Sequence, residues 1–124
     1  MQSMTNIQTA TDALKPGETA LCIYTEGHNL SINADGSGSS GWWVLDPDRE
    51  VDRVVIYLKA SEDRITNDIY VGDPDDIDGP RQEDGRYRVL LANLQLVGHT
   101  DANWYSFAAA GQNPIRYVSK PATK

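Results

Sequence analysis

Residues 41–58 constrain the possible folds of this chain more than any other stretch. They hold two of the three Trp residues, Trp42 and Trp43, then a turn-forming Asp-Pro-Asp sequence and the segment DRVVIYL. β-branched and aromatic residues dominate this last segment, which is typical of a strand buried on at least one side. We predict a strand over residues 52–59, in a hairpin with the short strand that carries the two Trp.

Further strand candidates are short and are separated by turn signals. Strands are predicted at residues 19–24, 42–45, 52–59, 68–72, 86–97 and 115–118. The longest is expected to carry a bulge near Asn93, and one short helix is predicted at residues 102–110, capped by Asp101. Strands and helices do not alternate, which disfavours a parallel sheet. The predicted fold is α+β, mainly β: a small antiparallel or mixed open β-barrel of about six strands with one or two short helices.

The chain has 124 residues, of which 40% are hydrophobic, so it can build one core without disulfides or structural metals. We predict a flexible N-terminal tail or one loose helical turn at residues 1–16, a single β-rich domain at 17–119 and a C-terminal tail at 120–124. Residues 26–41 are polar and end in a Gly- and Ser-rich run, and they are expected to form a long surface loop. A second surface loop, with six acidic residues, is predicted at 73–84.

Charge and composition argue against several functions. The 11 Lys and Arg residues are outnumbered by 18 Asp and Glu, and the resulting net charge of -7 repels a phosphate backbone. The N-terminus lacks the features of a signal peptide, and no apolar run is long enough to span a membrane, so we expect a cytoplasmic protein. Cys22 is the only cysteine, and no spacing of His or Cys indicates a metal site or a nucleophile. We assign no catalytic residue, metal or cofactor.

The aromatic residues carry the most specific functional signal. Trp42 and Trp43 are adjacent, so on a strand one points toward the core and the other toward the far surface or a cleft. On a helix, the side chains of the neighbours Trp104 and Tyr105 likewise point in different directions. Exposed aromatic rings form platforms that stack bases, and Asn103 can read a ligand edge through its amide. We therefore predict ligand binding by these five residues; the alternative is that the Trp residues belong to the core.

The order of these elements resembles the PUA-like superfamily of small β-barrels, especially its EVE and YTH-type members. The resemblance covers about residues 41–118: a Trp before DRVVIYLK, a short strand ending in Tyr-Val-Gly, and a long strand after Gly-Arg-Tyr. It implies a base-sized pocket of the kind that binds RNA or modified bases, with Trp42 or Trp43 and Trp104 as walls. The chain lacks the basic surface expected around such a pocket, which favours a free nucleotide or a single flipped base over a polymer.

Two functions therefore compete. The first is a non-catalytic binding module that recognises a nucleobase or nucleotide-type ligand, including a modified base, in an aromatic pocket. The alternative is an acidic protein-interaction module, such as a small phage or mobile-element inhibitor, whose residues 73–84 bind a basic protein partner or imitate the charge of DNA. An enzyme with catalytic residues scattered along the chain ranks third.

Overall fold

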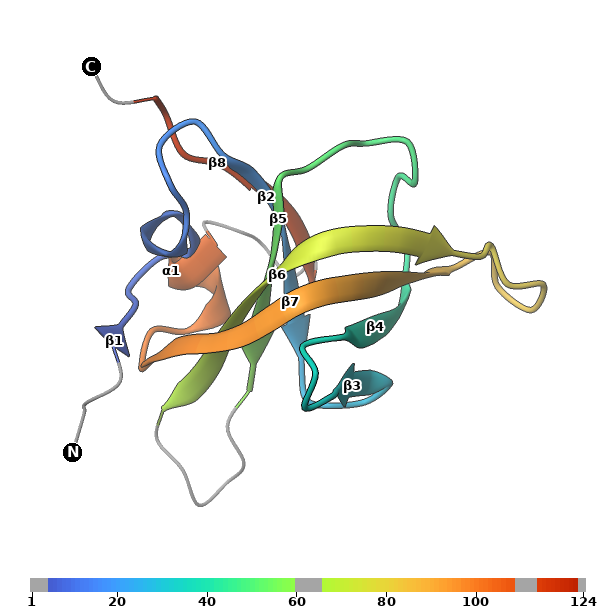
Figure 1. Cartoon of the computed structure of the whole chain (residues 1–124), viewed down its shortest axis with the longest axis horizontal. Helices are drawn as coiled ribbons and strands as arrows, with labels where there is room; N and C mark the ends of the chain where they lie inside the picture. The colour runs from blue at the N-terminus through green and yellow to red at the C-terminus, as the bar shows by residue number, and fades with distance from the viewer. Residues whose placement is uncertain (1–4, 60–65, 109–113, 123–124) are drawn as a thin grey trace.

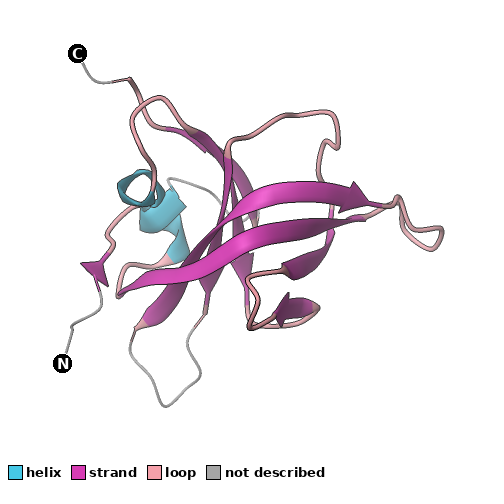
Figure 2. Cartoon of the chain, viewed as in Figure 1, coloured by secondary structure: helices cyan, strands magenta, loops and turns pink. Residues whose placement is uncertain are grey.

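The computed structural model describes residues 5–59, 66–108 and 114–122. Within these ranges the chain forms eight strands, one 3-10 turn and one short α-helix (Figures 1 and 2). The strands are β1 (Thr5–Asn6), β2 (Thr19–Thr25), β3 (Leu30–Ile32), β4 (Gly38–Trp43), β5 (Arg53–Leu58), β6 (Asn67–Asp78), β7 (Tyr87–Thr100) and β8 (Ile115–Ser119). The 3-10 turn is η1 (Ala10–Ala13), and the helix is α1 (Trp104–Ala108).

All eight strands join one mixed sheet in the order β3-β4-β7-β6-β5-β2-β8, with β1 paired to β7 beside this path. The β2–β5 and β1–β7 pairs are parallel, and the other pairs are antiparallel. The long hairpin of β6 and β7 runs across β2, β5 and β8 in Figure 1. The predicted class, a mainly β mixed open barrel with a short helix, is confirmed. The short strands β1 and β3 raise the number of strands from the predicted six to eight.

The two faces of the sheet bury separate apolar clusters. The interior cluster contains side chains from each of the strands β2 to β8, so it fills the inside of the curled sheet. The outer cluster lies on the other face, where η1 and α1 cover β2 and β5. Ile23 and Ile56 belong to the first cluster, whereas their neighbours Cys22 and Val55 belong to the second. β2 and β5 are buried on both faces, which explains why each is a continuous apolar run in the sequence.

The hairpin predicted between the Trp pair and residues 52–59 is wrong. β4 pairs with β3 and β7, and β5 pairs with β2 and β6, so two strands separate β4 from β5 in the sheet. The Asp-Pro-Asp sequence does make a turn, but residues 44–52 then continue as a long connection between distant strands. Local turn chemistry indicates where a chain bends and does not determine which strand it pairs with next.

Both predicted long loops contain strand residues. Residues 26–41 include β3 and the first part of β4, which form a tight hairpin. In the acidic segment, β6 continues through Asp78 because β7 provides a ladder partner as far as Arg88. Only the tip of this hairpin remains a loop, and it contains Gly79 and Gly85 with φ of 126° and 71°.

The N-terminal segment differs from the flexible tail that the sequence predicts. The expected helical turn is present as η1, but β1 also pairs with β7. Ile7, Ala10 and Leu14 are buried in the outer cluster, with exposed fractions of 5% or less. These three apolar side chains are widely spaced among polar residues, so they produce no recognisable strand or helix pattern.

The bulge near Asn93 and the short helix are present as predicted, but the helix has a different capping residue. Asn93 has a φ of 53° at a register shift between β6 and β7, which confirms the predicted bulge. The helix begins at Trp104, and its cap is Asn103 instead of Asp101: Asn103 Oδ1 accepts a hydrogen bond of 2.9 Å from the Ser106 N–H. Among the described residues, no helix is long and apolar enough to cross a membrane.

Candidate ligand-binding site

Four aromatic rings pack together where α1 meets β2 and β5. Tyr57 lies at the centre, with its ring 5.6 Å from Tyr24, 5.6 Å from Trp104 and 5.2 Å from Phe107, measured between ring centres. The Tyr24 pair is stacked and the other two are edge-to-face, which are the arrangements that aromatic rings favour. Tyr57, Trp104 and Phe107 are buried, whereas Tyr24 is half-buried. The cluster therefore reaches the surface at Tyr24.

A depression opens beside this cluster, and we call it the aromatic depression. Its volume is ≈ 350 Å³, which falls within the range of small-molecule sites. Its lining residues are Tyr24, Tyr57, Lys59, Asn103, Trp104, Tyr105 and Pro114. The three predicted site residues near α1 thus border one concave surface, together with two Tyr residues from the sheet.

A buried polar network fixes the floor of the aromatic depression. Tyr57 Oη donates a hydrogen bond of 2.6 Å to the Ala102 carbonyl oxygen. The same Oη accepts from Asn67 Nδ2 at 2.9 Å, and Asn67 Nδ2 also donates to the Thr100 carbonyl oxygen at 3.1 Å. Burial, reinforced by Tyr24, raises the pKa of Tyr57 to about 12, so its hydroxyl stays protonated and remains a donor even at pH 10. The network joins β5 to the segment that leads into α1.

The rim of the aromatic depression combines one exposed ring with two polar groups. Tyr105 is 53% exposed, so its ring can contact a ligand without any loss of core packing. Asn103 Oδ1 is occupied by the helix cap, which leaves its amide nitrogen as a donor. Lys59 is exposed and contributes a positive charge. This set suits a flat ligand that accepts hydrogen bonds and carries negative charge.

Trp42 and Trp43 occupy different environments, as adjacent residues on a strand should. The Trp43 ring packs against the interior cluster, and its Nε1 donates to Ser40 Oγ at 3.0 Å. Two guanidinium groups lie over the Trp42 ring, with the Arg81 and Arg88 Cζ atoms 4.8 Å and 5.3 Å from its centre. Both Trp rings are thus engaged with neighbouring side chains, and both are half-buried.

A second depression of ≈ 290 Å³ lies beside the Trp pair. Its lining residues are Tyr24, Thr25, Glu26, His28, Asn29, Gly41, Trp42, Trp43 and Pro114. It shares Tyr24 and Pro114 with the aromatic depression, so the two concave surfaces adjoin. The structure therefore brings all five predicted site residues to neighbouring surfaces, although they come from distant parts of the sequence.

Sequence reasoning missed the two Tyr residues that the sheet contributes to this surface. Tyr24 and Tyr57 sit in apolar strands and pair directly across the parallel β2–β5 ladder. That pairing was invisible without the strand order. The only available signal was that each apolar strand carries a Tyr near its C-terminal end, whose hydroxyl needs a partner when the ring is buried.

The acidic segment is largely neutralised by the chain itself. Arg53 pairs with Asp73 at 2.8 Å, Arg88 with Asp78 at 2.7 Å, and Arg81 with Asp84 at 2.8 Å. The Arg81 pair is bidentate, because Nε also donates to Asp84 at 3.0 Å, and it lowers the pKa of that carboxyl to about 2. Glu83 also lies 3.9 Å from Arg81, so four of the six acids in this segment are paired with arginines.

The single cysteine of the chain, Cys22, is buried. Burial raises the pKa of Cys22 to about 12, against a smaller opposing effect of Arg116, so the thiol is neutral and packed in the outer cluster. In residues 5–59, 66–108 and 114–122, no three His, Cys, Asp or Glu side chains are grouped as metal ligands would be.

The fold and site together define a small, mainly β open barrel with an aromatic concave surface on its outer face. No family model, curated protein or solved structure matches this chain. The resemblance to PUA-like barrels consequently stays a prediction.

Proposed function

We propose that this protein is a non-catalytic binding module for a nucleobase or nucleotide-type ligand, held in the aromatic depression. One observation carries the proposal: a base-sized cavity combines an aromatic floor with an exposed ring, the amide donor of Asn103 and a cation. An aromatic floor favours flat heterocycles, since stacking of a base contributes about 1 to 3 kcal/mol. Tyr105 is the candidate stacking residue, and Asn103 is the candidate reader of the base edge.

The aromatic depression is a better ligand site than the surface beside Trp42 and Trp43. Arginine groups already lie over the Trp42 ring, and Trp43 is tied to the interior cluster and to Ser40. A ligand there would have to displace existing contacts. We therefore assign these two residues to an adjoining wall that meets the site at Tyr24 and Pro114.

Lys59 divides the candidate ligands into two groups. An ammonium group at the rim favours a mononucleotide over the corresponding nucleoside, because only the former carries phosphate charge. The net charge of -7 opposes a long polyanion, whose many phosphates would approach other acidic surfaces. A free nucleotide or one flipped base fits this balance better than an RNA strand.

The proposal is tested by fluorescence titration of a Trp42→Phe/Trp43→Phe variant, in which Trp104 is the single Trp reporter at the floor of the site. The panel contains nucleosides, modified nucleosides, their 5′-monophosphates and short single-stranded oligonucleotides. We expect saturable quenching by one class of ligand. Tyr105→Ala should weaken that binding by about 5- to 150-fold, which corresponds to the loss of one stacking contact.

Leu96→Ala serves as the matched control, because Leu96 is an exposed apolar residue of β7 that does not line the depression. It should leave the affinity unchanged. Lys59→Gln should reduce the preference for monophosphates while retaining nucleoside binding. Quenching by no member of the panel, or equal affinity of the Tyr105→Ala and parent proteins, would refute base binding at this site.

A further inference from the structure

A second opening leads from the surface into the interior of the barrel, and we call it the barrel slot. It lies between the connection from β4 to β5 and the second half of β6, and its volume is ≈ 250 Å³. Leu21, Val54 and Val89 line it, and these are buried members of the interior cluster. Leu45 and Ile77 are partly buried lining residues of the same cluster. The opening therefore leads down to buried residues of the barrel core.

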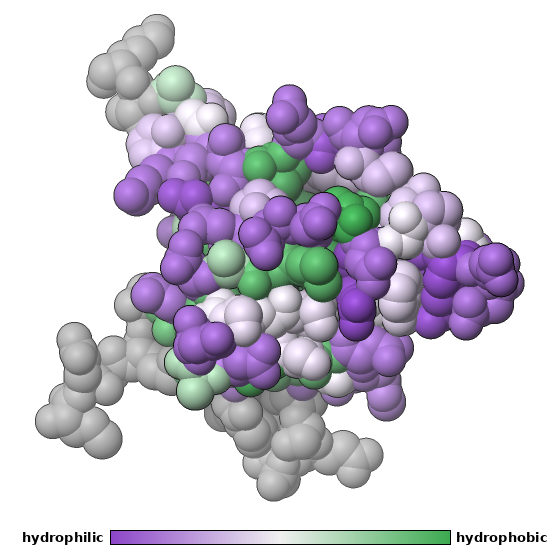
Figure 3. Space-filling view, turned by 45° about the vertical axis from the view of Figure 1, so that its right-hand side comes forward, coloured by the Kyte–Doolittle hydropathy of each residue, from purple (hydrophilic) through white to green (hydrophobic). Residues whose placement is uncertain are grey.

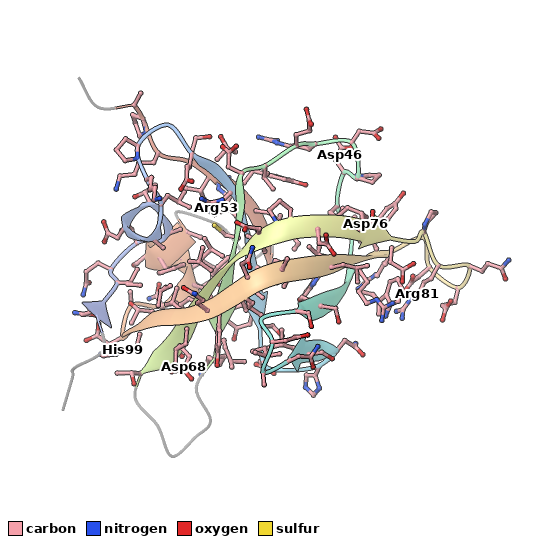
Figure 4. The ribbon with its side chains drawn as sticks, viewed as in Figure 1. Asp46, Arg53, Asp68, Asp76, Arg81 and His99 are labelled. Carbon is pink, nitrogen blue, oxygen red and sulfur yellow. The ribbon has the colours of Figure 1, made fainter. Side chains whose placement is uncertain are left out.

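Four carboxylates surround the barrel slot. Asp46 and Glu50 come from the connection, and Asp75 and Asp76 come from β6. Figure 4 shows Asp46 above the end of β6 and Asp76 on that strand, so the two groups approach the opening from different elements. Apolar surface with hydrophilic residues around it is visible on the face drawn in Figure 3. The slot thus combines an apolar floor with an acidic rim.

These four carboxylates differ from the other acids nearby. Within the described part of the chain, none of the four forms an ion pair, whereas Asp73, Asp78 and Asp84 are each paired with an arginine. The remaining charged residue of the lining, Arg49, lies with its guanidinium over the Tyr117 ring at 4.0 Å. The uncompensated negative charge of this region is therefore concentrated around an apolar opening.

We propose that the barrel slot is a docking site for a basic protein segment that inserts one apolar side chain between flanking Lys or Arg residues. The slot is smaller than a usual small-molecule pocket and suits a single anchoring side chain. The rim complements positive charge, and the net charge of -7 attracts a basic partner over longer distances. The same charge disfavours a second copy of this chain or a nucleic acid as the occupant. This site is separate from the aromatic depression and does not depend on base binding.

The test uses three five-residue peptides, each acetylated and amidated, titrated into ¹⁵N-labelled protein. Lys-Lys-Phe-Lys-Lys carries both features, Lys-Lys-Ala-Lys-Lys carries only charge, and Ser-Ser-Phe-Ser-Ser carries only the anchor. We expect saturable amide shifts at Val54, Ile77 and Val89 with the first peptide. The other two should bind at least about fivefold more weakly, because a buried anchor and rim charges each contribute to a hot spot.

An Asp75→Asn/Asp76→Asn variant should bind Lys-Lys-Phe-Lys-Lys about fivefold more weakly than the parent protein does. The matched control is Glu83→Gln/Asp101→Asn, which removes the same charge at exposed positions outside the slot and should leave its affinity nearly unchanged. Both variants are checked for retained folding by their amide spectra. The proposal is overturned if Lys-Lys-Phe-Lys-Lys does not bind, if the alanine peptide binds equally well, if both double variants weaken binding equally, or if the shifts map elsewhere.

Discussion

Replacement of Trp104 by Ala distinguishes a core role for this residue from a purely ligand-binding one. Trp104 is 6% exposed, and its ring centre lies 5.8 Å from Tyr24, 5.6 Å from Tyr57 and 6.3 Å from Phe107. Burial of a Trp side chain removes about 200 Å² from water, which corresponds to about 5 kcal/mol at 25 cal/mol per Å². Measured Trp→Ala changes in cores fall near 3 to 5 kcal/mol. We therefore expect a loss of about 4 kcal/mol in the free energy of unfolding.

The assay is equilibrium unfolding in urea, followed by far-UV circular dichroism so that the signal does not depend on Trp fluorescence. Domains of this size are commonly stable by only about 5 to 15 kcal/mol, so the variant should show a much lower midpoint with an unchanged m-value. Trp42→Ala is the comparison, because Trp42 is half-buried under arginines, and it should cost about 1 to 2 kcal/mol. A loss below about 1 kcal/mol for Trp104→Ala would refute the core assignment and would favour a free pocket wall.

Three further predictions concern burial and backbone packing. The unfolding free energy should fall as the pH rises from 9 to 12, because burial raises the pKa of Cys22 from 9.0 and that of Tyr57 from 10.0, each to about 12. Each neutral side chain contributes its full stabilisation below the pKa that it has in the unfolded chain, and this contribution is lost as the pH rises toward its folded pKa. Cys22→Ala removes the group with the lower unfolded pKa, so in urea titrations this variant should begin to lose stability near pH 10 instead of pH 9. In the native protein at pH 8, Cys22 should resist a thiol reagent that labels it rapidly in urea; fast native labelling would contradict its burial. Gly38→Ala should destabilise the protein by about 1 to 3 kcal/mol in thermal unfolding, because its Cβ would lie 2.5 Å from the Ser31 carbonyl oxygen, whereas Ser39→Ala on the same strand should cost less.

Part of the candidate site could be predicted from local sequence patterns around the helix α1. A short helix near residues 102–110 was predictable from the sequence, and the adjacent positions of Trp104 and Tyr105 were sufficient to expect one buried and one exposed ring. The structure has Trp104 at 6% and Tyr105 at 53% exposure. The identity of the cap was not predictable between Asp101 and Asn103, because both residue types favour that position and only the observed register distinguishes them.

Composition and residue order by themselves determined the mainly β class, the position of β2, β5, β7, β8 and the first half of β6, and the acidic balance of the chain. These properties depend on side-chain chemistry over short distances, where β-branched runs, Gly and Pro act directly on the backbone. Tertiary structure alone decided that β4 pairs with β7, that β2 and β5 are parallel neighbours, and that the N-terminal segment covers the outer face. It also decided that Tyr24 and Tyr57 meet Trp104, and that four carboxylates surround one apolar slot. Such contacts join residues far apart in sequence, and their free energy comes from burying surfaces that no single segment can bury alone.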